Sequence, residues 1–193
     1  MKRALIFGLI AFVVAATVAF LMSFLPFQGQ TRFILPIVVG ILMAFAWMGI
    51  SGNRKVVTVS AQERDQSLAA PPPEGSGAVW IYREGFVGKA VGYDVGVDGH
   101  VVAQLKSPAS TRLVLAAGSH AITAALPGSP GGMSPNPAQV TLNVVAGQTL
   151  VYRMSMKMGA LKNTLIFEPQ ADVAGALQKL SGTPMVAPLA ATA

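Results

Sequence analysis

The sequence of 193 residues contains no cysteine. Disulfide bonds, metal sites built on thiolates and catalysis by a cysteine nucleophile are therefore excluded. A bacterial lipoprotein anchor is excluded as well, because the lipid of such an anchor is attached to a cysteine side chain.

Charged and histidine side chains are also scarce. Only 11% of the residues are charged, whereas about 25% is usual in soluble domains. The net charge is +6, but no run of basic residues marks the second half, so we expect no nucleic-acid partner. Zinc needs three or four ligands, and His100 and His120 are the only histidines. We therefore expect neither a metal nor another cofactor.

Two long apolar segments without charge, Ala4–Leu25 and Phe33–Ile50, dominate the N-terminal part. At about 1.5 Å per residue, the first is long enough to cross a hydrocarbon core of about 30 Å, and the second is near the lower limit. We therefore predict a two-helix transmembrane anchor over residues 1–50 in a lipid bilayer, and an integral protein of the inner membrane. Small residues recur at four-residue spacing and predict close helix packing: Ala11, Ala15 and Ala19, then Gly40 and Ala44.

The basic residues around these segments predict an orientation. Five of them flank the pair, and only Arg32 lies between the two segments; the five are Lys2, Arg3, Arg54, Lys55 and Arg64. This bias predicts a cytoplasmic C-terminal domain. The first segment also resembles a secretory signal peptide, so its cleavage is left open.

Residues 51–77 are expected to form a linker, since Pro71–Pro73 favours an extended polyproline spacer. Residues 78–170 show short alternating segments with turn signals, of which Asp98-Gly99 is the strongest. Asp172–Leu180 is predicted to form a short helix within a final segment, 171–193, that is otherwise a disordered tail. Eight strands are predicted, and together they indicate a mainly β chain with a small antiparallel β-sandwich: 78–82, 91–97, 100–105, 111–115, 120–126, 139–145, 149–156 and 163–167.

Several motifs of this β region occur in a familiar order. They are Trp80–Arg83, Phe86–Gly88, Tyr93–Gly99, Leu115–His120, Ala146–Thr149, Val151–Arg153 and Lys157–Gly159. Over roughly residues 77–167 the chain resembles a PEGA-like family of bacterial envelope proteins of unknown function. The resemblance implies a β-sandwich, a binding role without catalysis and, because relatives are often lipoproteins, a periplasmic position. The lack of cysteine and the two apolar segments depart from that pattern.

Motifs that would support catalysis are incomplete. Gly85–Ala90 resembles a phosphate-binding loop but has Ala90 where a Ser or Thr would bind magnesium. Ser119 and His120 are neighbours on a predicted strand, so their side chains point to opposite faces. We interpret Asp98 as a turn residue and Asp94 as solvent-exposed. We predict that the protein is not an enzyme; the rival interpretation, a hydrolase, requires a cleft in which a histidine meets a carboxylate.

The sequence therefore predicts a membrane-anchored binding module of a bacterial envelope protein. Its partner is expected to be another membrane or envelope protein or a surface glycan. The candidate interaction surface consists of Arg83, Phe86, Tyr93 and His100, and burial of Phe86 and Tyr93 would count against it. The alternative is a structural subunit of a membrane protein assembly, with the helical hairpin as its contact.

Overall fold

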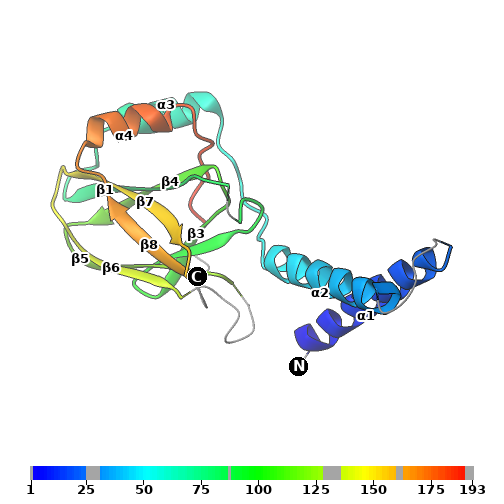
Figure 1. The fold of residues 1–193 in the computed structure, drawn as a ribbon. Coiled ribbons are helices and arrows are strands. Elements are labelled where there is room, and N and C mark those ends of the chain that lie inside the picture. The colour runs from blue at the N-terminus through cyan, green and yellow to red at the C-terminus, as the bar shows by residue number, and fades with distance from the viewer. Residues whose placement is uncertain (1, 25–30, 87, 128–135, 160–162, 190–193) are drawn as a thin grey trace. The chain divides into compact units, whose positions relative to one another are not determined.

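The computed structural model describes residues 2–24, 31–86, 88–127, 136–159 and 163–189. The chain divides into two compact units, Met1–Gly52 and Asn53–Ala193. The first unit contains the helices α1 (Lys2–Met22) and α2 (Thr31–Ser51), and the second contains all the strands (Figure 1).

The two helices of the first unit pack through small residues. A Cβ atom added to Gly40 of α2 would lie 2.5 Å from the carbonyl oxygen of Ala11 and 3.0 Å from the Cβ of Ala15 in α1. Ala44, one turn further along α2, is fully buried. These contacts agree with the predicted close packing at Ala11, Ala15, Gly40 and Ala44. Ala19, which was expected to pack in the same way, is exposed.

The prediction of two transmembrane helices is wrong. In the part of the chain that the structure describes, no helix has the length and apolar character needed to cross a membrane. The predicted integral inner-membrane localisation is corrected with it.

Eight strands in two four-stranded sheets form the second unit. The first sheet has the order β4 (Ala109–Ala116), β1 (Ser76–Arg83), β7 (Thr149–Lys157), β8 (Thr164–Pro169). The second has the order β3 (His100–Leu105), β2 (Tyr93–Val97), β5 (Gly118–Ala125), β6 (Ala138–Val144). Each strand overlaps one of the eight predicted strands, and the arrangement is consistent with a β-sandwich.

One strand pair departs from the predicted antiparallel arrangement. β1 and β7 are parallel, with Ala78 opposite Thr149 and Arg83 opposite Met154. The turn between β6 and β7 carries the chain from the second sheet to the first and sets this direction. It is held at the start of β1, where Gly147 N–H donates to the carbonyl of Ser76 and Ala78 N–H donates to that of Gln148.

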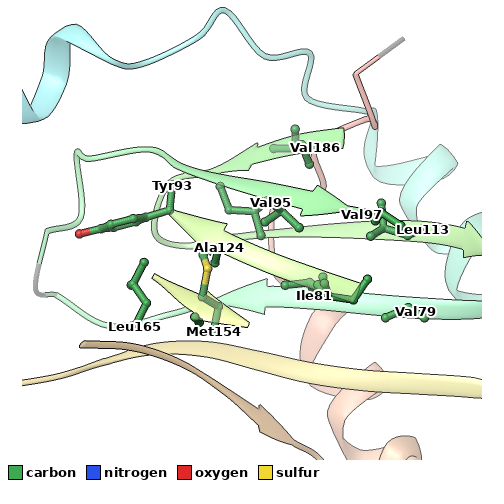
Figure 2. Packing of buried hydrophobic residues seen from close by; sticks show 14 of the residues in the cluster. Val79, Ile81, Tyr93, Val95, Val97, Leu113, Ala124, Met154, Leu165 and Val186 are labelled. Atoms are coloured by element: carbon green, nitrogen blue, oxygen red, sulfur yellow. The ribbon is translucent and has the colours of Figure 1, made fainter. Parts of the chain in front are cut away.

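The main core lies between the two sheets. Along β1, Val79 and Ile81 point into this core, whereas Trp80 belongs to a second cluster on the other face, as the alternation of a strand requires. Figure 2 shows side chains from both sheets in the main core, among them Val95 of β2 and Met154 of β7. All eight residues of β1 are buried, so this central strand is covered on both faces.

Two helices cover the outer face of the first sheet (Figure 1). They are α3 (Ala61–Ala69), which begins with a capping box between Ser60 and Glu63, and α4 (Val173–Leu180), which Asp172 caps. The cluster beneath them comprises Trp80, Tyr82, Val151, Ala176, Leu180 and Met185, with Val59, Leu68, Val173 and Leu177 partly buried against it. The stretch expected to be a linker therefore contributes a helix to the second unit.

The final segment, expected to be a disordered tail, is ordered where the structure describes it. Ser110 N–H donates to the carbonyl of Pro184, and Val186 N–H donates to that of Ser110. Val186 is buried in the main core. Residues 190–193 lie outside the described residues.

Candidate interaction surface

The side chain of Arg83, at the end of β1, organises the loop between β1 and β2. Nη1 donates to the carbonyl of Val91 at 2.6 Å, and Nη2 donates to that of Gly88 at 2.8 Å. The guanidinium lies 4.5 Å from the centre of the Tyr93 ring, a cation–π contact. Arg83 is only 4% exposed, and this burial lowers its pKa. The charge is therefore used inside the protein to hold the loop.

Two further side chains hold the same loop. Ser107 donates from Oγ to the carbonyl of Gly85 at 2.7 Å and from its N–H to the carbonyl of Lys89 at 3.1 Å. Asn53 donates from Nδ2 to the carbonyl of Ala90 at 2.9 Å, and its Oδ1 accepts from the N–H of Gly92 at 2.7 Å. Backbone groups at Gly85 and at 88–92 are thus bound by groups from outside the loop.

Phe86 lies in this fixed loop with its side chain in solvent. The residue is 88% exposed, the highest value among the large exposed hydrophobic residues. Its carbonyl accepts a hydrogen bond from Lys89 N–H at 3.1 Å, which orders the backbone that carries the ring. An aromatic side chain on an ordered loop loses little conformational freedom when it binds a partner.

The four residues of the candidate surface do not share one exposed face. Arg83 and Tyr93 contact each other but are buried, at 4% and 3% exposure. His100 is exposed at the far end of the hairpin, because it pairs with Val97 whereas Tyr93 pairs with Leu105. Phe86 alone combines exposure with a position beside the Arg83–Tyr93 contact. The alternation that places Tyr93 on one face with Val95 already indicates that the ring points inward.

A polar cluster on β2 and β3 was missed by the sequence analysis, which interpreted Asp94 as exposed. Asp94 is only 8% exposed, and both of its carboxylate oxygens accept from Arg54, at 3.2 Å from Nε and 3.0 Å from Nη2. Gln104 donates to Asp94 Oδ1 at 2.7 Å, and its own Oε1 accepts from Arg54 N–H at 2.6 Å. The hydrogen bond to Asp94 raises the pKa of Arg54. The sequence did contain one signal of this cluster. Gly92 and Gly96, two positions before and after Asp94, have no side chain and leave room for other side chains to cover that face of β2.

The second histidine, His120, has an oxygen at each ring nitrogen. Nδ1 lies 2.7 Å from Asp98 Oδ2, and Nε2 lies 3.0 Å from the carbonyl oxygen of Ala116. A histidine that donates from both nitrogens is charged and has no lone pair for accepting a proton. The contact with a carboxylate that the hydrolase interpretation required therefore exists, but it does not provide a general base. Within the described ranges, no group of three or more His, Asp or Glu side chains is arranged to hold a metal ion.

Comparison with known proteins adds no relative. No family model matches the sequence, and no curated protein shows significant similarity to it. The resemblance to PEGA-like domains stays a prediction from the motifs of the β region.

Proposed function

We propose that this protein is a non-catalytic interaction module and that its contact surface centres on Phe86. The observation that carries the proposal is an aromatic ring, 88% exposed, on a loop that Arg83, Ser107 and Asn53 hold in place. Aromatic residues often dominate binding energy at protein interfaces. The PEGA-like resemblance supports the same role and indicates an envelope protein or a surface glycan as the partner.

The polar clusters support a binding role over catalysis. The Asp94 carboxylate is occupied by Arg54 and Gln104, and both ring nitrogens of His120 face oxygen atoms. An acid or base in catalysis needs a free donor or acceptor within reach of the substrate. The protein uses these groups to hold loops and turns.

A photoreactive phenylalanine analogue at position 86, introduced in living cells, tests the proposal. The control carries the same analogue at Val145, which is 54% exposed in the turn between β6 and β7. We expect an adduct of discrete mass at position 86 only, and mass spectrometry of the adduct separates a protein partner from a glycan. Absence of adducts, or the same adducts at both positions, would contradict the proposal.

A second role, as a subunit of a larger assembly, is favoured by the surface of the helical unit. One face of α1 carries large apolar residues in solvent: Leu9, Phe12 and Phe20 are 62%, 71% and 65% exposed. Large exposed apolar patches mark interaction sites. We therefore propose that another protein subunit covers this face of α1.

Native mass spectrometry of the full chain extracted in mild detergent tests this second role. We expect the double variant Leu9→Ser/Phe12→Ser to lose a subunit that the unmodified chain retains, whereas Phe86→Ser, which removes a ring that is 88% exposed elsewhere, keeps it. A lone monomer for the unmodified chain would contradict the role. Flotation of the chain with phospholipid vesicles, lost in the double variant while the chain stays monomeric, would assign the apolar face to a lipid surface instead.

A further inference from the structure

The two sheets of the second unit have four edge strands, β4 and β8 in one and β3 and β6 in the other. An edge strand presents a row of backbone N–H and C=O groups that pair readily with another strand. Natural proteins cover such edges or place charges and prolines on them. The four edges of this protein differ in how they are protected.

Three of the edges are protected by the chain itself. The segment 184–189 covers β4 through the hydrogen bonds of Ser110 and reaches β3, where Leu189 N–H donates to the carbonyl of Val102 at 2.7 Å. On β8, Leu165 N–H donates to the carbonyl of Asn136 at 3.0 Å, and the strand ends with Glu168-Pro169. A charge and a proline at that position discourage pairing with another strand.

The fourth edge, β6, packs beside β8, and Asn136, two residues before the strand, hydrogen-bonds with Asn163 and Leu165 there. Along Ala138–Val144 itself, the described residues show no charge, no proline and no backbone hydrogen bond from a covering segment. It pairs with β5 on one side, and no described strand pairs with it on the other. Its sequence, AQVTLNV, contains neither a charged residue nor a proline. Gln139, Thr141 and Asn143 are neutral and alternate with the buried residues Ala138, Leu142 and Val144.

We propose that β6 pairs with the β6 strand of a second copy, antiparallel and centred on Thr141. The sequence of the strand is complementary to itself in this register. Thr141 lies opposite Thr141 of the other copy, and Gln139 lies opposite Asn143, so hydroxyl and amide groups meet without like charges. A shift by one residue would bring the apolar side chains to the outer face. The two second sheets then form one continuous sheet.

A groove beside this edge agrees with the same contact. It has a volume of about 310 Å³ and lies between the edges of β6 and β8. Its walls come from Pro137, Ala138, Gln139 and Val140 on one side and Leu165, Ile166 and Phe167 on the other. Pairing of two β6 strands places the two grooves side by side and removes their apolar walls from water.

Single cysteines test the pairing, because the chain has no thiol of its own. Opposed residues of an antiparallel pair lie about 4.5–5.5 Å apart between Cα atoms, within the range of a disulfide. We expect Thr141→Cys to form a disulfide dimer under mild oxidation. Gln139→Cys and Asn143→Cys should stay monomeric alone but form a mixed dimer when combined. The control Ser119→Cys, exposed on the central strand β5, should form none.

Two further variants test whether the crosslink reports pairing of the two β6 strands and not another contact. Thr141→Lys places two like charges opposite each other on an exposed position, so in the Leu9→Ser/Phe12→Ser background it should fold and lose the remaining dimer in analytical ultracentrifugation. The Leu9→Ser/Phe12→Ser background should leave the Thr141→Cys crosslink intact, which separates this interface from the face of α1. A Thr141→Cys crosslink no faster than that of Ser119→Cys, or absence of the mixed dimer, would overturn the proposal.

Discussion

Asp98 Oδ2 lies 2.7 Å from Nδ1 of His120, and this contact joins the turn between β2 and β3 to strand β5. The other carboxylate oxygen accepts from the N–H of Ala121 at 2.8 Å, and Nε2 of His120 faces the carbonyl oxygen of Ala116. Asp98 has φ of +49°, in the left-handed region that Asp tolerates in such turns. The pair therefore holds a turn whose backbone conformation is less common for a residue with a side chain.

This contact makes stability depend on pH in two steps. The hydrogen bond to Asp98, followed by that to Ala116, raises the pKa of His120 from its ordinary value of 6.5. The hydrogen bond from His120 lowers the pKa of Asp98 from 3.8, with smaller contributions from Ala121 and the nearby His100. The stabilisation from His120 is complete below pH 6.5 and is lost as the pH rises through its folded pKa. That from Asp98 is present above pH 3.8 and is lost as the pH falls through its folded pKa.

Titration of the His120 Cε1 proton by NMR checks the shift, and Asp98→Asn should return the midpoint towards 6.5. Urea unfolding should show that the unmodified chain loses stability relative to His120→Gln when the pH rises from 5.5 to 8. His100→Gln serves as the control, since the structure shows no ion pair for His100. Equal pH dependence in the unmodified chain and the His120 variant would contradict the prediction.

Arg83→Lys should destabilise the second unit by about 2 kcal/mol, because hydrogen bonds from charged groups to buried acceptors contribute about 1.5–3 kcal/mol each. A lysine keeps the charge, but it lacks the planar fork that binds the carbonyls of Gly88 and Val91 together. Urea unfolding measures the loss. Arg64→Lys on α3, where the described ion pair of the arginine is with its sequence neighbour Asp65, should change stability by less than about 0.5 kcal/mol. Similar losses in both variants would show that Arg83 has no special role.

The strands could be predicted from the sequence because their signals are local. Alternation along β2 and the Asp98-Gly99 turn involve only neighbouring residues, and the structure forms a hairpin there. The parallel pairing of β1 with β7 could not be predicted this way, since it depends on where a turn between two sheets lies. Composition also gave the extent of an apolar run and not the bounds of the helix within it, since α1 ends at Met22.

In the candidate site, too, the sequence predicted what depends on neighbouring residues and missed contacts between distant ones. Strand alternation places Asp94 on the outer face of its sheet, and the interpretation as an exposed residue followed from that. The residue that covers it, Arg54, comes from 40 positions earlier in the chain, and no local pattern connects the two. Phe86 was predicted as one of four surface residues, and it is exposed because it lies in a loop between glycines, where no strand partner buries it.

Leu180→Ala should destabilise the second unit by about 2–4 kcal/mol, the usual cost of removing a buried leucine side chain. Leu180, the last residue of α4, is fully buried in the cluster that contains Trp80 and Met185. Leu177→Ala on the same helix is the matched control, because Leu177 is only partly buried against that cluster and should cost less. Urea unfolding of both variants ranks them, and a larger loss for Leu177 would contradict the packing of α4 on the sheet.

Gly92→Ala should destabilise the second unit by about 1–3 kcal/mol, the usual cost of overpacking. A Cβ atom there would lie 2.5 Å from Gln104 Oε1 and 2.9 Å from Asn53 Oδ1, so the hydrogen bonds that these groups make with Arg54 and the β1–β2 loop would be disturbed. Gly182→Ala is the control, because a Cβ there meets nothing within 4 Å and should be neutral or stabilising by up to about 1 kcal/mol.

A double-mutant cycle tests whether the Gln104 side chain is the cause of the Gly92→Ala loss. Gln104→Ala alone should destabilise, since it leaves Asp94 and Arg54 N–H without the hydrogen bonds that Gln104 makes. In that background, however, the new methyl group at position 92 no longer meets Gln104 and keeps only the close contact with Asn53 Oδ1, so Gly92→Ala should cost less than in the unmodified chain. Residues in contact are expected to couple in this way, whereas distant residues add. Additive losses of unfolding free energy would show that Gly92 is required for a reason other than the room it leaves for Gln104.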